Sequence, residues 1–377
     1  MPYWRLSGFY FFYFATLGVL APYWSLYLHS IGFDAVAIGQ LMALLMVSRI
    51  VAPNVWGWVA DHRARRMQVV RLAAALTVVA FVGVFFGTSF WWLALVMLAF
   101  SFFWNASLPL LEVTTMNYVG REPGAYGRVR LWGSLGFIVS VLALGAVIEA
   151  RGPWWVLPAL LSLMLGIWLF SLLLPESQVP PLAGAPQSWR KTLWRPEIGV
   201  FLAACLLMQL SHGPYYTFYS IYLESHAYAK TTIGALWAFG VVSEIGVFLL
   251  MPRLMRRWPL RGLLLASFSA AMVRWLLIGF FPDHIAVLIL AQVLHGATFG
   301  SFHASAIQMV HRFFTGRHQH RGQALYGSVS FGIGGAVGSL YSGYAWDTLG
   351  AAATYGVAAA AATMAFAIAY VGIKSRS

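Results

Sequence analysis

The stretch GQLMALLMVSRI, residues 39–50, is an apolar run with an arginine, Arg49, near its end. It is echoed by GALWAFGVVSEI, residues 234–245, which lies 195 positions later and has Glu244 in the place of Arg49. An ionised side chain at the centre of a membrane-spanning helix is unfavourable by about 2.5 to 3.5 kcal/mol. The two stretches therefore indicate related membrane-spanning segments, and their charged residues are candidates for a functional role.

The whole chain has the composition of a protein that is dissolved in lipid. Of its 377 residues 60% are apolar and 9% are charged, whereas about a quarter of the residues in a soluble domain are charged. Cys205 is the only cysteine, so an intrachain disulfide is excluded. The apolar segment after Arg5 is longer than a signal-peptide core and lacks a small-residue cleavage site, so we interpret it as a spanning helix.

Twelve segments are apolar over the roughly 20 residues that a helix needs to cross a bilayer. They are 5–28, 36–60, 68–87, 90–118, 128–150, 153–174, 198–223, 231–251, 262–281, 284–310, 322–345 and 350–373. A long polar connection, residues 175–197, divides them six and six. This pattern predicts an N-terminal bundle over residues 1–174, a cytoplasmic linker, and a C-terminal bundle over residues 198–377.

The basic residues lie mainly on one side of this predicted topology. Twenty lysines and arginines lie in or beside the connections of one side and two, Arg151 and Lys230, on the other. Positive charge is retained in the cytoplasm, so both termini and the linker are predicted to face the cytoplasm of a bacterial inner membrane. The net charge of +13 is thus a topology signal, and no nucleic-acid partner is predicted.

Two further echoes accompany the one at residues 39–50. PYWSLYL (22–28) is similar to PYYTFYSIYL (214–223). RLWGSLGF (130–137) is similar to ALYGSVSFG (324–332) at an offset of 194. Three echoes in the same order at nearly one offset predict two parallel six-helix repeats, as in transporters that work by alternating access. The expected fold is an all-α membrane protein of two pseudo-symmetric six-helix bundles.

The connection after the second segment reads GWVADHRARR, residues 57–66. It resembles the loop motif of the major facilitator superfamily, which helps to lock the cytoplasmic gate in members of that superfamily. The matching positions are Gly57, Asp61, Arg65 and Arg66. His62 and Ala64 stand where the motif has a basic residue and a glycine.

Four stretches resemble the phenylpropionate permease family, which is related to the lactose permease and nucleoside permease proton symporters. They are YGRVRLWGSLGF (126–137), VVSEIGVF (241–248), MVRWLLIG (272–279) and QVLHGATFGSFHASA (292–306). The resemblance implies proton-coupled import of a small organic solute, with an aromatic monocarboxylate such as 3-phenylpropionate as the best match. The alternatives are a sugar or nucleoside symporter, a drug efflux carrier of the same fold, and a ligand-binding membrane sensor.

The resemblance also implies roles for charged residues within the segments. Those that match lactose permease are Glu112, Arg130, Glu244, Arg274 and His295. In the superfamily architecture the fifth helix meets the eighth, so Arg130 and Glu244 are expected to pair in one conformation. Thr298 stands where lactose permease has a proton-carrying glutamate, so that protonation step does not carry over.

The spacing of polar residues adds further candidates. Asn105 lies seven residues before Glu112 on the same predicted helix face. His295 and His303 are eight residues apart, roughly 80° around a helix, so both can border one cavity, and a histidine can carry a proton near neutral pH. A polar and aromatic stripe on the seventh segment is expected to line the cavity, and it consists of Gln209, His212, Tyr216 and Tyr219.

Arg49 has two possible partners, the carboxylate of a substrate or backbone carbonyls near Pro53, and the sequence leaves both open. No nucleophile with a base, metal cluster or phosphate loop is present, so we predict neither an enzyme nor a metal site nor a cofactor. The proton gradient is the expected driving force. The expected partners are a small organic solute, a proton and the lipid bilayer, with no obligate protein partner for a monomeric chain.

Overall fold

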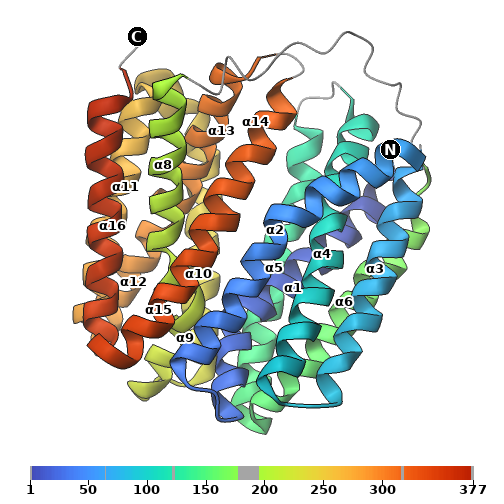
Figure 1. Cartoon of the computed structure of the whole chain (residues 1–377), viewed down its shortest axis with the longest axis horizontal. Helices are drawn as coiled ribbons and strands as arrows, with labels where there is room; N and C mark the ends of the chain where they lie inside the picture. The colour runs from blue at the N-terminus through green and yellow to red at the C-terminus, as the bar shows by residue number, and fades with distance from the viewer. Residues whose placement is uncertain (1, 64, 121–123, 177–194, 316–317, 375–377) are drawn as a thin grey trace. The chain divides into compact units, whose positions relative to one another are not determined.

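The computed structural model describes residues 2–63, 65–120, 124–176, 195–315 and 318–374. Every regular element within these ranges is a helix (Figure 1). The prediction of an all-α membrane protein is therefore confirmed. Most of the predicted linker, residues 177–194, lies outside the described residues.

The first half of the chain forms long helices joined by short connections (Figure 1). The helices are α1 (Tyr3–Ser30), α2 (Ala35–Arg63), α3 (Arg66–Val82), η1 (Gly83–Phe85), α4 (Phe90–Val119), α5 (Ala125–Arg151), η2 (Pro153–Trp155) and α6 (Val156–Leu173). Gly152 ends α5 with a φ of +88°, a conformation that only glycine adopts without strain. Gly350 makes the corresponding turn in the second half with a φ of +82°, so the sequence repeat extends to backbone geometry.

The second half contains three helical runs whose geometry changes along their length. Its elements are α8 (Pro196–Ser211), α9 (Gly213–Ser225), α10 (Lys230–Arg257), α11 (Leu260–Phe280), α12 (Ile285–His295), η3 (Gly296–Ser301), α13 (Phe302–Phe313), α14 (His318–Gly327), η4 (Ser328–Gly334), α15 (Gly335–Leu349) and α16 (Ala351–Gly372). Both η3 and η4 are π-helical, and each continues directly into the α-helices on either side. Short π-helical stretches inside α-helices occur frequently at functional sites.

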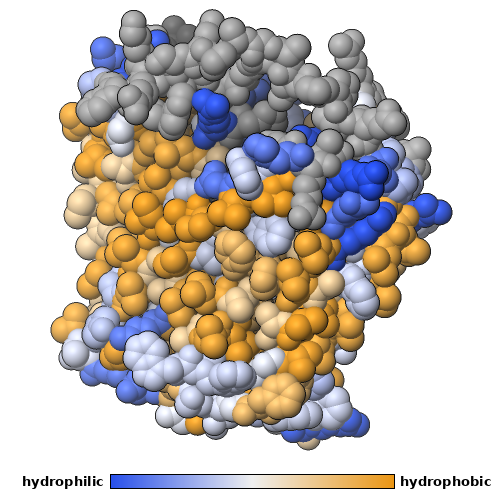
Figure 2. Space-filling view, turned by 45° about the vertical axis from the view of Figure 1, so that its right-hand side comes forward, coloured by the Kyte–Doolittle hydropathy of each residue, from blue (hydrophilic) through white to orange (hydrophobic). Residues whose placement is uncertain are grey.

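Within the described part of the chain, eleven helical segments are long and apolar enough to cross a membrane. The remaining predicted segment, 322–345, lies in the continuous helical run of α14, η4 and α15. Its many glycines and serines make it less apolar than the others. In Figure 2 apolar side chains spread over the middle of the face shown, and most hydrophilic ones lie toward its upper and lower ends.

The described helices group into two compact units. The first contains α1, α2 from Val47 onward, α3 to α6, and the start of α10 as far as Gly234. The second contains the start of α2 as far as Met46, α8 and α9, α10 from Ala235 onward, and α11 to α16. Helices α2 and α10 therefore each contribute to both units.

Helix α1 is buried along most of its length because it packs against both α5 and α6 in the first unit. A Cβ atom at Gly136 of α5 would lie 2.2 Å from the carbonyl oxygen of Phe11. The Ser140 hydroxyl donates a hydrogen bond of 2.9 Å to the carbonyl of Ala15. Small residues on α5 thus let two backbones approach closely, as in many membrane helix pairs.

In the second unit the helical run of the seventh segment is interrupted at His212, between α8 and α9. Pro214, which follows, has no backbone N–H to continue the helical ladder. Gly213 lies directly against α15, because a Cβ atom there would be 2.2 Å from the carbonyl oxygen of Gly338. The close contact between α9 and α15 therefore requires a glycine at the break.

We predict that Gly213→Ala destabilises the protein, because the added methyl group must push α9 away from α15. Overpacking of this kind typically costs about 1 to 3 kcal/mol, so the midpoint of thermal unfolding in detergent should fall by several degrees. Gly199→Ala on α8 is the matched control, since a Cβ atom there meets nothing within 4 Å. An equal effect of both substitutions would contradict the close contact.

Candidate functional site

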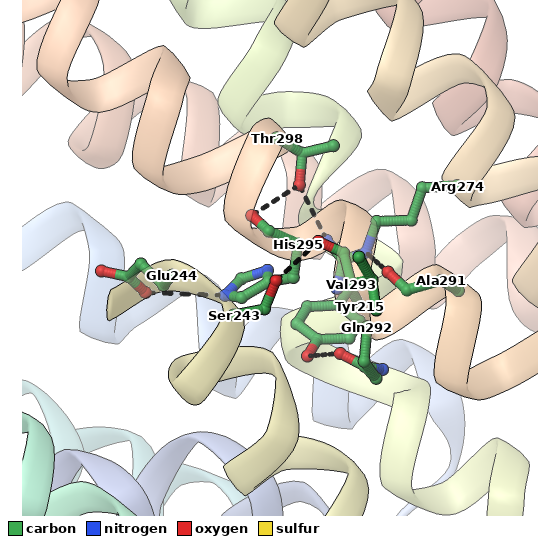
Figure 3. Close-up of polar contacts among 9 residues, drawn as sticks. All are labelled: Tyr215, Ser243, Glu244, Arg274, Ala291, Gln292, Val293, His295 and Thr298. Carbon is green, nitrogen blue, oxygen red and sulfur yellow. Dashed lines mark hydrogen bonds and ion pairs between the residues drawn. The ribbon is translucent and has the colours of Figure 1, made fainter. Parts of the chain in front are cut away.

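Arg274 on α11 is the central residue of a polar cluster inside the second unit (Figure 3). Its side chain is fully buried. The Nε atom donates a hydrogen bond of 3.0 Å to the Ala291 carbonyl, and Nη1 donates one of 3.3 Å to Thr298 Oγ1. The guanidinium carbon lies 4.1 Å and 4.6 Å from the ring centroids of Tyr215 and Trp275. Aromatic faces and neutral oxygens thus surround this cation.

His295, the last residue of α12, joins Arg274 to Glu244 of α10. The imidazole Nε2 lies 3.8 Å from Glu244 Oε2, and Thr298 Oγ1 donates a hydrogen bond of 3.2 Å to the His295 carbonyl. The imidazole Nδ1 and the Nη2 atom of Arg274 are both buried and have no hydrogen-bond partner among the described residues. The structure therefore brings together the three charged residues that the resemblance implied for the eighth to tenth segments.

Gln292 belongs to this cluster, although the sequence did not single it out. Its Oε1 atom accepts a hydrogen bond of 3.1 Å from the Tyr215 hydroxyl, and its Nε2 atom donates one of 2.7 Å to Tyr219 Oη. All three side chains are buried. A glutamine in an otherwise apolar run, three residues before His295, was the available signal. Gln292 fixes two tyrosines of α9 against α12.

The π-helical stretch η3 lies at the closest approach of α10 to this cluster. The Ser243 hydroxyl donates a hydrogen bond of 2.7 Å to the Val293 carbonyl (Figure 3). A Cβ atom at Gly296 would lie 2.7 Å from the Ser243 carbonyl oxygen, and one at Gly240 would lie 2.9 Å from Gln292 Oε1. Glycines thus let the backbones of α10 and the α12–η3 run meet beside Glu244.

His303 lies on the same side of its helical run as His295, and Phe299 separates the two rings. Ring centroids are 5.7 Å apart between His295 and Phe299, and 5.9 Å apart between Phe299 and His303. The Nδ1 atom of His303 lies 3.2 Å from Tyr326 Oη of α14. The two histidines therefore lie on one side of the helical run with an apolar ring between them, and the cavity that both are expected to border stays a prediction.

His212 lies at the break between α8 and α9 and contacts Trp275, the residue after Arg274. Its Nδ1 atom is 2.8 Å from the Met208 carbonyl oxygen, and its ring meets that of Trp275 edge to face at 4.8 Å. The ring also stacks on Tyr216 at 5.9 Å. Two members of the predicted stripe, His212 and Tyr216, thus contact each other, and His212 faces the helix that carries Arg274. The cavity that the stripe is expected to line stays a prediction.

A second group of candidates lies in the first unit around α1. The guanidinium carbon of Arg130 on α5 lies 3.8 Å from the ring centroid of Phe14 and 6.0 Å from that of Tyr10. Arg130 is within electrostatic reach of Glu112 on α4, which accepts a hydrogen bond of 3.4 Å from the Tyr126 hydroxyl. Glu112 and Arg130, two of the residues that match lactose permease, thus lie in a mixed aromatic and charged environment.

Asn105 lies on the same helix as Glu112 and contacts α2. Its Nδ2 atom donates a hydrogen bond of 2.7 Å to Ser48 Oγ, which is adjacent to the half-buried Arg49. The Tyr13 side chain is within electrostatic reach of Arg49, Glu112 and Arg130. Three ionisable candidates from three helices therefore act electrostatically on one tyrosine of α1.

Some predicted relationships stay predictions. Arg130 belongs to the first unit and Glu244 to the second, so the structure does not test their expected pairing.

In the gate motif, Gly57 has open space beside its Cα atom, and Arg65 precedes the first residue of α3, Arg66. The side chain of Asp61 lies outside the described residues. Among the residues that are described, no group of three or more His, Cys, Asp or Glu could hold a metal ion.

The chain is similar to known transporters over nearly its whole length. A family profile described as "MFS_1 like family" matches residues 3–357. The "Probable 3-phenylpropionic acid transporter" of Escherichia coli (strain K12) is 31% identical over 358 residues, which cover 92% of this chain and 92% of that protein. The "Maltose permease" of Geobacillus stearothermophilus is 29% identical over 343 residues, covering 89% and 86%. A mutant of the nucleoside transporter NupG has the same fold, with a TM-score of 0.87 at 18% identity over 98% of this chain and 99% of that one.

We predict that Gln292→Leu destabilises the second unit, because the Tyr215 and Tyr219 hydroxyls lose their common partner while they stay buried. Leaving buried polar groups unsatisfied costs about 1 to 3 kcal/mol each, which thermal unfolding in detergent would detect. Combining Gln292→Leu with Tyr215→Phe and Tyr219→Phe removes the unsatisfied hydroxyls and should restore part of the stability. A triple variant no more stable than the single one would argue against this bridging role.

Proposed function

The chain belongs to the MFS_1-like family and is a multi-pass membrane transporter, and from that premise we propose that it is a proton-coupled symporter. Its proposed substrate is a small aromatic monocarboxylate, imported by alternating access. The observation that carries the proposal is that each unit brings together ionisable side chains from several helices that are otherwise apolar. Such residues are energetically costly inside a membrane, and they are a functional-site hypothesis by default.

Proton exchange requires an acid and a base at close range, and the second unit supplies this pair. The Glu244 carboxylate lies 3.8 Å from the His295 imidazole, and the side chain of Glu244 is 19% exposed against 7% for His295. Thr298 is bonded to Arg274 and to the His295 carbonyl, and its hydroxyl does not titrate at physiological pH. These contacts support Glu244 as the group that binds and releases the proton, with His295 beside it.

The proposed substrate follows from the charges and rings of the first unit. Arg49 and Arg130 are cations, and a guanidinium binds a carboxylate through two parallel hydrogen bonds. The rings of Tyr10, Tyr13 and Phe14 offer apolar and quadrupolar faces to an aryl group. The relative from Escherichia coli, whose name includes 3-phenylpropionic acid, supports the same chemical class.

The proposed transport also has a driving force and an orientation in the membrane. The proton gradient is the proposed driving force, without a cofactor, for a chain that acts as a monomer. The proposed membrane is the bacterial inner membrane, with both termini and the linker in the cytoplasm. The excess of lysine and arginine in the connections of one side supports this orientation.

Uptake of a neutral sugar or nucleoside is the second candidate, since the maltose permease of Geobacillus stearothermophilus is 29% identical to this chain. A sugar has no carboxylate for Arg49 or Arg130 to bind. Thermal stabilisation by each compound therefore separates the two substrate classes. Maltose, xanthosine and 3-phenylpropionate would be compared for their ability to raise the thermal unfolding midpoint of the purified protein.

We expect purified protein in lipid vesicles to accumulate labelled 3-phenylpropionate when the outside is made acidic relative to the inside. A protonophore should abolish the accumulation, because it removes the driving force without touching the protein. Empty vesicles under the same gradient measure passive entry of the protonated acid. Equal uptake in vesicles with and without protein, for this acid and for related aryl carboxylates, would refute the proposed substrate.

Glu244→Gln should reduce gradient-driven accumulation to the level of vesicles without a gradient, because an amide cannot bind the transported proton. Exchange of internal for external substrate needs no net proton movement, so it should continue. Asp347→Asn is the matched control, since Asp347 is an exposed carboxylate near the end of α15 in the same unit. Normal accumulation by Glu244→Gln would remove Glu244 from the proton pathway.

A further inference from the structure

Trp104 on α4 has a buried hydrogen-bond donor that nothing in the described part of the chain satisfies. Its side chain is 3% exposed, and its indole N–H has no partner. Leaving such a group unsatisfied is costly, and native proteins rarely do so without a reason. Trp24, which is also buried in the first unit, places its N–H 3.4 Å from Met97 Sδ. A buried indole of this unit can therefore find a partner, as that of Trp24 does.

A chain of ring contacts connects Trp104 to a cation, the guanidinium of Arg130. Its ring stacks on Tyr13 with centroids 4.9 Å apart and an interplanar angle of 16°. Tyr13 in turn meets Phe14 edge to face at 5.4 Å, and the Arg130 guanidinium lies 3.8 Å above Phe14. Trp104, Tyr13 and Phe14 form a continuous aromatic wall that ends at Arg130. Tyr13 is itself buried, with 5% of its surface exposed.

The neighbour of Trp104 in the sequence, Asn105, links α4 to α2. Asn105 donates its hydrogen bond to Ser48 of α2, and Arg49 is the next residue on that helix. Trp56 of α2 also has an unsatisfied indole N–H, but its ring packs on Phe102 and Phe103. Neither of those rings carries a cation in the described structure, so only Trp104 combines the free donor with a wall that ends in a positive charge.

We propose that the Trp104 indole N–H donates a hydrogen bond to the carboxylate of the substrate, together with the Tyr13 hydroxyl, while Arg130 balances the charge. The proposal rests on the proposed import of an aromatic monocarboxylate and names the residues that select the acid. A carboxylate accepts at about four lone-pair sites and donates at none, so it suits a wall whose polar groups are hydrogen-bond donors and which ends in a cation. An alcohol or a primary amide of the same shape presents donors of its own and fewer acceptors.

Trp104→Phe tests this role, because it keeps an aromatic ring against Tyr13 and removes the N–H donor together with the five-membered ring that carries it. Dissociation constants would be measured by isothermal titration of purified protein with 3-phenylpropionate and with the neutral 3-phenylpropan-1-ol. We expect affinity for the acid to fall by about tenfold or more, as for a lost hydrogen bond to a charged acceptor. Affinity for the alcohol should change by less than about twofold, a difference of under half a kcal/mol.

Trp24→Phe is the matched control, since it removes a buried indole whose N–H already has a partner, and it should leave both affinities unchanged. Wild-type affinity for the acid in Trp104→Phe would overturn the proposal, while import of the acid by the wild-type protein would still stand. Equal losses for the acid and the alcohol would assign Trp104 a packing role and overturn the proposal as well. A wild-type protein that binds no aryl carboxylate would instead refute the proposed substrate, and this inference with it.

Discussion

A guanidinium inside a bilayer has no bulk water to solvate it, so its partners must come from the protein. Arg274 shows what this requirement does to the second unit. The Ala291 carbonyl, the Thr298 hydroxyl and the faces of Tyr215 and Trp275 surround its cation. Within the described residues no carboxylate contacts it directly. These partners come from α9, α11, α12 and η3, so a single charge constrains how four elements pack.

The same requirement accounts for the irregular backbone beside Arg274. A regular α-helix uses each carbonyl internally, which limits what its backbone offers to a neighbour. Around η3 the carbonyls of Ala291, Val293 and His295 accept hydrogen bonds from side chains of Arg274, Ser243 and Thr298, respectively. The absence of a side chain at Gly296 makes room for Ser243 to reach the run. The π-helical stretch therefore contributes to the hydrogen bonds that stabilise the cluster.

The sequence was sufficient for those features that depend on composition and period. The long apolar runs predicted the helices, and the repeat at residues 39–50 and 234–245 predicted that equivalent segments follow one another in two halves. The resemblance to lactose permease singled out Glu244, Arg274 and His295 one by one, and these three residues lie in one cluster. In each of these cases the signal is carried by residue type and spacing along one chain.

Features that depend on which side chains meet in space were not predictable. Gln292 is an unremarkable polar residue until α9 places two tyrosines on either side of its amide. The indole of Trp104 is one of 17 tryptophans, and only the packing of α1 and α4 shows that its donor is unsatisfied. Thr298 is identified by sequence as a departure from lactose permease, but its bond to Arg274 requires the coordinates.

Under the proposed function the two units would perform different chemistry. The first holds arginines and aromatic rings suited to an organic anion, and the second holds the Glu244 and His295 pair suited to a proton. Symport requires that each event change the free energy of the other. Two helices belong partly to each unit. Helix α2 belongs to the second unit up to Met46 and to the first from Val47, just before Arg49. Helix α10 belongs to the first unit up to Gly234 and to the second from Ala235, ahead of Glu244. Each of these two helices therefore carries a charged candidate residue, Arg49 or Glu244, on a helix that contributes to both units.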